Sequence, residues 1–206
     1  MPQTLISIIA LILSIATIVI TFFQYRAQKN AINVTNKSIV YSDKLKACIF
    51  VKALCENCVY NYSLLDTGAD MGKEKCLRNL EILLRNPFLN DMQEQITNPE
   101  TFEKWFLKAQ IIDKNIAIIN VLWEKDIAGP VDDFLYAYKK TMNQLYEYYV
   151  SEFTEVDLRK GYLPITETIK DGDAADNITS SIEDLKKSMN SLSKNGILEK
   201  MRESIK

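Results

Sequence analysis

Residues 4–23 read TLISIIALILSIATIVITFF, and this stretch decides how the rest of the chain is interpreted. It contains no charged residue, no glycine and no proline. As an α-helix it would be about 30 Å long, which matches the hydrocarbon core of a bilayer. The sequence therefore predicts a single transmembrane helix with the lipid bilayer as its partner. The alternatives are a buried core helix and a cleaved signal peptide, but the residues after the stretch offer no small-residue cleavage site.

Basic residues follow the predicted span and do not precede it. Arg26, Lys29 and Lys37 come soon after it, and residues 24–52 hold six basic residues against one acidic residue, which suits an anionic cytoplasmic leaflet. The positive-inside rule predicts an uncleaved signal-anchor with its N-terminus outside and its body in the cytoplasm, at the inner (plasma) membrane. The expected divisions are an anchor (1–23), a basic juxtamembrane helix continuing from it (24–52) and a cytoplasmic helical bundle (53–206).

Small and hydroxylated residues recur along one face of the predicted span. They follow one another at alternating steps of three and four residues, which is a seven-residue repeat. Helices in lipid associate through small residues that let their backbones approach, so the repeat predicts self-association or pairing with another protein. The alternative is that the hydroxyl groups bond to carbonyl groups of their own helix. This stripe consists of Ser7, Ala10, Ser14, Thr17 and Thr21.

Apolar residues beyond the span recur at steps of three and four, and no segment alternates with a period of two. The predicted fold class is therefore all-α, an antiparallel bundle of four to five helices. Neither proline nor glycine occurs from residue 3 to residue 67, so the span is expected to continue as one long helix. Further helices are predicted over residues 73–85, 98–129, 131–160 and 178–192, with a short one after Gly196.

Two of these helices carry matching coiled-coil-like seams. The first seam is Phe102, Trp105, Ala109, Ile112, Ile116, Ile119 and Trp123. The second seam is Val131, Leu135, Tyr138, Met142, Leu145, Tyr149, Phe153 and Val156. Gly129-Pro130 is predicted to end the first helix, so the two should fold back on each other as a hairpin. Asp171-Gly172-Asp173 predicts a loop before the last long helix.

The chain contains no histidine, which excludes Ser-His-Asp catalysis and zinc sites with histidine ligands. It has neither a GxxxxGK[ST] phosphate loop nor a GxGxxG turn. Residues 53–206 hold 19 basic and 26 acidic side chains, so a nucleic-acid-binding body is not expected. We therefore expect a protein that is not an enzyme, needs no cofactor and does not bind nucleic acid.

The four cysteines are the only candidate metal ligands with a recognisable spacing. Cys55 and Cys58 form a CxxC pair, and Cys48 and Cys76 would complete a four-thiolate site. However, Cys48, Cys55 and Cys58 lie on one face of a continuous helix, as packing residues do, and free cysteine is among the most buried residue types. The sequence favours core packing, with metal binding and redox chemistry as alternatives.

Tyrosines crowd the segment 131–160 and predict either an aromatic contact surface or partial burial. The five are Tyr136, Tyr138, Tyr146, Tyr148 and Tyr149, of which Tyr138 and Tyr149 belong to the seam.

Three functions remain open from the sequence. The first is a membrane-tethered, non-enzymatic helical interaction module, such as a scaffold or a regulatory or sensor partner at the inner leaflet. The second is a metal-binding or redox protein built on the cysteines. The third is an exported, receptor-like ectodomain with the opposite orientation. The sequence favours the first.

Overall fold

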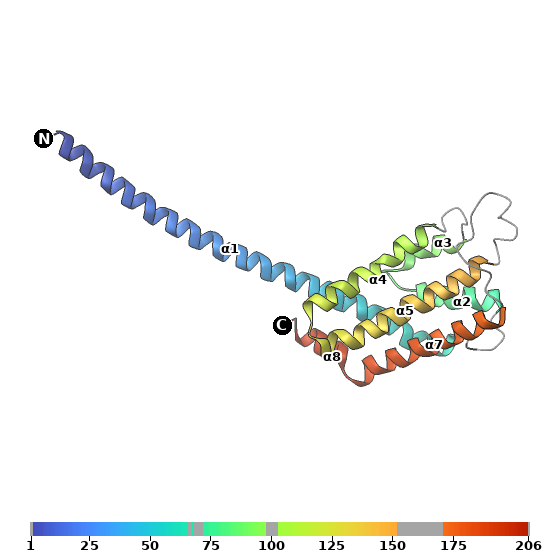
Figure 1. Ribbon diagram of the computed structural model, residues 1–206. Coiled ribbons are helices and arrows are strands. Elements are labelled where there is room, and N and C mark those ends of the chain that lie inside the picture. Colours follow the sequence, from blue (N-terminus) through green and yellow to red (C-terminus); the bar gives the residue numbers. More distant parts are fainter. Residues whose placement is uncertain (1, 66, 68–71, 98–102, 152–170, 206) are drawn as a thin grey trace. The chain divides into compact units, whose positions relative to one another are not determined.

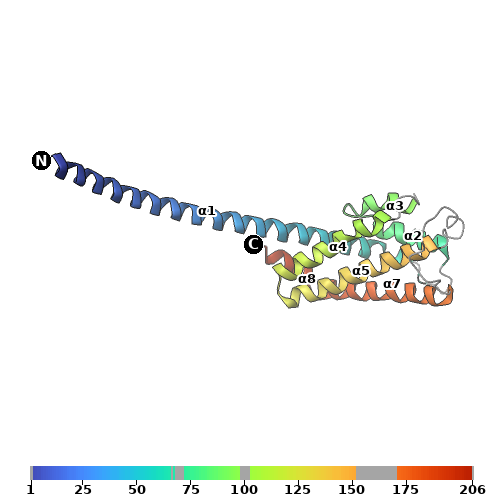
Figure 2. The same ribbon diagram turned by 45° about the horizontal axis from the view of Figure 1, so that its top comes forward.

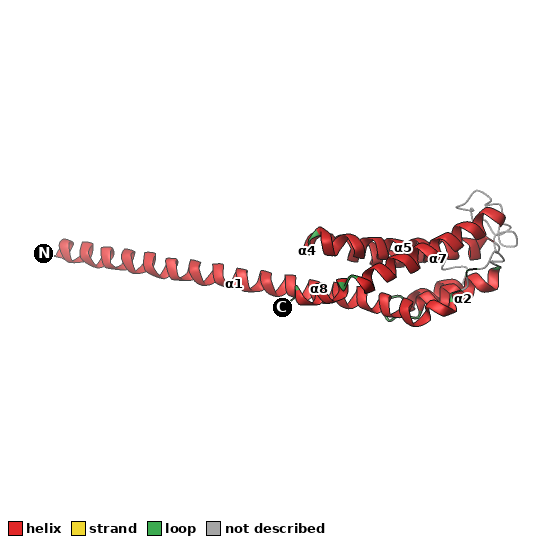
Figure 3. Ribbon diagram, turned by 90° about the horizontal axis from the view of Figure 1, so that it is seen from below, coloured by secondary structure: helices red, strands yellow, loops and turns green. Residues whose placement is uncertain are grey.

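The computed structural model describes residues 2–65, 67, 72–97, 103–151 and 171–205. Nearly all of these residues are helical, and no strand occurs among them (Figure 3). The all-α prediction is therefore confirmed for this part of the chain. Contacts divide the chain into two compact units, residues 1–43 and residues 44–206.

Helix α1 spans Pro2–Asn61, as expected from a stretch without an internal helix breaker. A short 3-10 helix, η1 (Tyr62–Leu64), follows it. Among the residues described, no helix is both long and apolar enough to cross a membrane. The side chains of residues 1–16, 18 and 19 are outside the described part, and most of the predicted span lies with them.

The second unit is a bundle whose central member is α5 (Lys125–Ser151). Helix α5 packs against α2 (Lys73–Leu84), α4 (Glu103–Leu122), α7 (Asp171–Lys194) and α8 (Ile197–Glu203) (Figures 1 and 2). The short elements η2 (Asn90–Met92) and α3 (Gln93–Thr97) contact each other, and η2 also contacts α4. The last turns of α1 contribute Phe50, Val51 and Leu54 to the same core.

All but one of the described residues of both predicted seams are buried, and α4 packs against α5, which confirms the predicted pairing. On α4, Ile116 is the one described seam residue that is only partly buried. Phe102, Phe153 and Val156 lie outside the described residues. The predicted apolar positions of α7 are also buried, and they cover α5. These α7 residues are Ile178, Ile182, Leu185, Met189 and Leu192.

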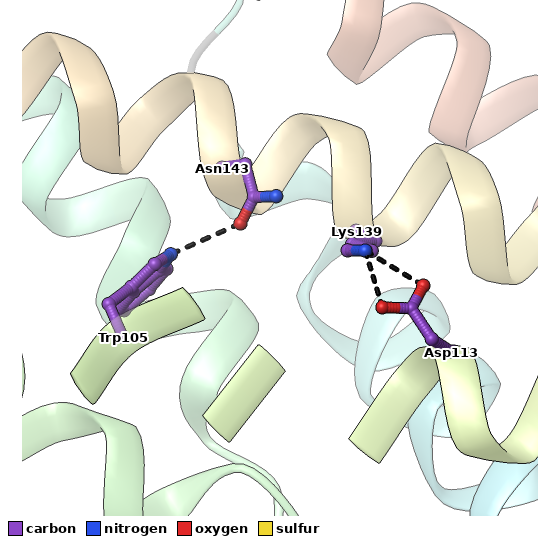
Figure 4. A network of polar contacts seen from close by, with 4 residues as sticks. All are labelled: Trp105, Asp113, Lys139 and Asn143. Atoms are coloured by element: carbon purple, nitrogen blue, oxygen red, sulfur yellow. Dashed lines mark hydrogen bonds and ion pairs between the residues drawn. The ribbon is translucent and has the colours of Figure 1, made fainter. Parts of the chain in front are cut away.

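Polar contacts set the antiparallel register of α4 and α5 (Figure 4). The Trp105 indole N–H donates to Asn143 Oδ1 at 3.1 Å, and Lys139 Nζ lies 2.6 Å from Asp113 Oδ2. The Trp105 ring also stacks on Tyr146, with 3.9 Å between ring centroids. From Trp105 to Asp113 the residue numbers rise along α4, while the numbers of their partners on α5 fall from Asn143 to Lys139. The two helices are therefore antiparallel, and these contacts define their register.

The predicted break at Gly129-Pro130 is wrong. Helix α4 ends at Leu122, and α5 begins at Lys125 and runs through both residues. A Gly-Pro terminator needs glycine in the left-handed conformation, which only Gly196 adopts among the described residues. Pro130 lies in the second turn of α5, just beyond the first turn where proline is best tolerated, and it leaves one internal hydrogen bond unmade.

The loop predicted at Asp171-Gly172-Asp173 is also wrong, because α7 already begins at Asp171. Acidic residues favour the first turn of a helix, where they face unpaired N–H groups. The predicted tail helix is present as α8, and it starts after Gly196, whose φ of 61° ends α7 with a left-handed turn. Met201 and Ile205 are buried, so the tail belongs to the core.

Candidate functional site

Large apolar side chains lie uncovered along α1 between residues 20 and 41. Each phenylalanine, tyrosine, isoleucine and valine in this stretch exposes between 43% and 68% of its surface. Contiguous apolar surface of this kind usually marks a site that binds protein or membrane. This stretch is therefore the first candidate for a functional surface.

Seven-residue steps arrange six of these side chains in two rows on one half of the helix. Between the rows lie small or amide side chains that continue the stripe predicted in the span. We call these residues together the exposed α1 face, and none of them is charged. It comprises Ile20, Gln24, Tyr25, Ala27, Gln28, Ala31, Ile32, Val34, Thr35, Ser38, Ile39 and Tyr41. On the opposite half of the helix lie Arg26, Lys29 and Lys37.

The predicted stripe in the span is described only at its C-terminal end. Thr17 and Thr21 are exposed, and Thr21 Oγ1 donates a hydrogen bond to the carbonyl oxygen of Thr17 at 2.8 Å. A threonine hydroxyl commonly bonds in this way to the carbonyl four residues earlier in its own helix, and this bond matches the alternative interpretation of the stripe. The side chains of Ser7, Ala10 and Ser14 lie outside the described residues.

All four cysteines are buried with free thiols. Burial raises the pKa of Cys55 to about 11 and raises the pKa of Cys58 and Cys48 as well. These thiols are therefore protonated at neutral pH, which makes them poor nucleophiles. Throughout the described ranges, no three Cys, His, Asp or Glu side chains gather in a way that could hold a metal ion. The geometry matches the packing interpretation.

A buried polar cluster joins three helices beside Cys58. Asn57 Nδ2 donates to the carbonyl oxygens of Ile82 and Leu83, both at 3.1 Å, and the Tyr138 hydroxyl donates to the same Leu83 carbonyl. Helix α2 ends at Leu84, and the residue four positions after Leu83 is Pro87, which has no N–H to offer. Side chains of α1 and α5 thus replace the missing donor at the C-terminus of α2.

The tyrosines of α5 divide between core and surface. Tyr138, Tyr146 and Tyr149 are buried, and Tyr148 is half-buried, so four of the five match the burial alternative. Tyr136 is 67% exposed and lines a shallow groove of about 350 Å³ between α5 and α7. Charges of both signs border this groove, and Lys140 Nζ lies 3.7 Å from Asp184 Oδ2. The groove is a second, smaller candidate surface.

Sequence reasoning missed Asn57 and the uncovered rows of α1. Pro87 is the signal for the first, because a proline just past a helix end leaves a carbonyl that needs another donor. The second needed the structure, because apolar residues in a helix are expected to be buried until their surroundings are known. Comparison with protein-family models, with curated proteins and with solved structures finds no match to this chain.

Proposed function

We propose that the protein is a membrane-tethered, non-enzymatic interaction module at the inner leaflet, in which α1 carries both the anchor and the binding surface. The observation that carries the proposal is the exposed α1 face. It begins at the C-terminal end of the predicted span, and its apolar side chains have no cover within their own unit. Farther along the same helix, Ala47 to Cys58 supply core residues of the bundle.

The residues at the end of the span support a tether in this orientation. Phe22, Phe23 and Tyr25 are each more than half exposed, and tyrosine, with its apolar ring and polar hydroxyl, prefers the interface between lipid and water. Arg26 and Lys29 follow at once, where an anionic leaflet attracts them. Aromatic and basic residues in this order are typical of the cytoplasmic end of a span.

Lipid does not reach the rest of the exposed surface when α1 stands across the bilayer. Ile32 lies about 14 Å beyond Phe23 along the helix, and Tyr41 lies about 27 Å beyond it. The headgroup layer on one side of a bilayer is only about 5–8 Å thick. Ile32, Val34, Ile39 and Tyr41 therefore need a protein surface as their cover, which makes protein binding the proposed role.

Membrane extraction and thiol labelling test the tether and its orientation. We expect the full chain to stay in the pellet after carbonate extraction and a chain lacking residues 1–23 to become soluble. Because the native thiols are buried, an introduced cysteine reports its own side of the membrane. Asn36→Cys should react with an impermeant maleimide only in permeabilised cells, and Gln3→Cys should react in intact cells.

Two results would overturn this proposal. Recovery of the full chain in the soluble fraction without detergent would remove the anchor. Labelling of Asn36→Cys in intact cells would favour the exported ectodomain. Zinc analysis of the purified protein, with Cys55→Ser and Cys58→Ser as controls, decides the cysteine-based alternative, because stoichiometric zinc that is lost in both variants would support it.

A further inference from the structure

We infer that the exposed α1 face binds the same face of a second copy of this chain, forming a parallel two-helix coiled coil that continues the stripe of the predicted span. The parallel direction rests on the proposed function, because two copies anchored in one membrane with one topology present α1 in the same direction. The pairing itself rests on the pattern, area and charge of the face.

The pattern of the face fits helix pairing. From Thr17 to Ser42 the small or amide positions follow one another at steps of four and three residues without a break. A strict seven-residue repeat keeps one face of two left-handed supercoiled helices in contact along their length. Small residues at the centre let the two backbones approach, and the apolar rows on each side then close over the contact.

The area of the face is sufficient for a specific dimer. Six large apolar side chains lie on it, and each exposes more than half of its surface. Covering the exposed halves would remove roughly 500 Å² of apolar surface per copy, at roughly 80 Å² for each side chain. The pair would bury roughly 1,000 Å², with Ile20 at the end of the span included, and this is where specific interfaces begin.

The charge pattern suits a second copy as the partner. In a parallel symmetric dimer the positions on the centre line meet their own equivalents, so a charged residue there would oppose a like charge. The exposed α1 face has no charged residue, whereas Arg26, Lys29 and Lys37 lie on the other half of the helix. Gln24 and Gln28 on the centre line can hydrogen-bond across the dimer axis, as a buried amide does when it fixes register.

Cysteine crosslinking in isolated membranes tests the pairing. Ala31→Cys and Ser38→Cys place a thiol at the centre of the face, and Asn33→Cys and Asn36→Cys place one on the far half of the same helix. All four positions are exposed, so the substitutions should not disturb folding. We expect a disulfide-linked dimer from the first two variants under mild oxidation and monomer from the last two.

A second substitution tests whether the face itself makes the contact. Adding Ala31→Lys to Ser38→Cys should abolish the dimer band, whereas adding Asn33→Lys should leave it. No dimer from either central cysteine, equal dimer from all four positions, or an adduct with a different protein would each overturn the inference. Carbonate extraction of the same membranes keeps the two ideas apart, because an anchored chain that does not crosslink refutes pairing and leaves the tether intact.

Discussion

Asn57→Leu and Tyr138→Phe, made singly and together, test whether two side chains jointly replace the hydrogen bond that Pro87 cannot provide. Tyr138→Phe removes the hydroxyl that donates to the Leu83 carbonyl and accepts a 3.4 Å bond from Asn57 Nδ2, and it should lower the free energy of unfolding by about 1 kcal/mol. Asn57→Leu removes the bonds to Ile82, Leu83 and the Tyr138 hydroxyl and the bond accepted from Asn61, and it should cost about 2–3 kcal/mol. Each single variant leaves the Leu83 carbonyl one side-chain donor.

The double variant should lose more than the sum of the two single losses. It leaves the Leu83 carbonyl without either side-chain donor, in a residue that is 1% exposed. An unsatisfied buried carbonyl costs about 1–3 kcal/mol, and this amount should appear as the coupling energy of the cycle. The structural reason is that both donors converge on one acceptor, so that either can serve when the other is lost.

Tryptophan fluorescence during urea unfolding of the full chain in detergent measures these losses. Trp105 and Trp123, the only tryptophans, are both buried in the second unit, so their signal reports the bundle without a contribution from the exposed part of α1. Asn115→Leu is the control, because its amide bonds to Ile111 of its own helix and it should cost under about 1 kcal/mol. Losses that add within about 0.5 kcal/mol would refute the shared-acceptor argument.

Three further outcomes are expected. Burial raises the pKa of Cys55 from 9.0 to about 11, so the unfolded chain loses the thiol proton at a lower pH than the folded chain does. The free energy of unfolding should therefore fall as the pH rises from 9 to about 11. Cys55→Ala should reduce this pH dependence in urea titrations. Trp105→Ala should lower the free energy of unfolding by about 3–5 kcal/mol, because it removes a large buried side chain from the core. Lys139→Met should lower it by under about 1 kcal/mol, because the Lys139–Asp113 ion pair is partly solvated. Urea unfolding curves of the two variants measure both losses. Gly196→Ala should lower stability by about 1–2 kcal/mol, because its φ of 61° strains any residue with a Cβ, and the thermal midpoint should drop with it.

Periodicity predicted the helices well because a helix in a bundle buries one side and leaves the other in water. The seam residues of α4 and α5 that are described follow this rule, and so do the apolar positions of α7. The same reasoning predicted that Cys48, Cys55 and Cys58 would pack together, since their steps of seven and three keep them on one side of α1. A pattern that depends on burial alone is readable from sequence.

The break between α4 and α5 was not readable, because tertiary contacts place it. Trp123 continues the apolar seam, so the pattern runs on past the real end of the helix. The Trp123 indole N–H donates to Ser204 Oγ at 2.7 Å, a contact between residues far apart in sequence. Just after Trp123, the N–H groups of Ile127 and Ala128 both donate to the Glu124 carbonyl, and α5 begins at this point. Local composition favoured Gly129-Pro130 instead.

Residues 20–41 and 47–58 of α1 both carry large apolar side chains, but only those of the second stretch are covered within their own unit. Helix formation does not explain the first stretch, because Ile32, Val34 and Ile39 favour a helix less than alanine, glutamate or lysine would. Burial within their own unit does not explain it either, since these side chains are more than half exposed there. Nor does lipid, which ends well before Ile32 when α1 spans the bilayer. A protein surface is the one remaining environment in which apolar, β-branched side chains at seven-residue steps lower the free energy, and it connects the fold to the proposed role.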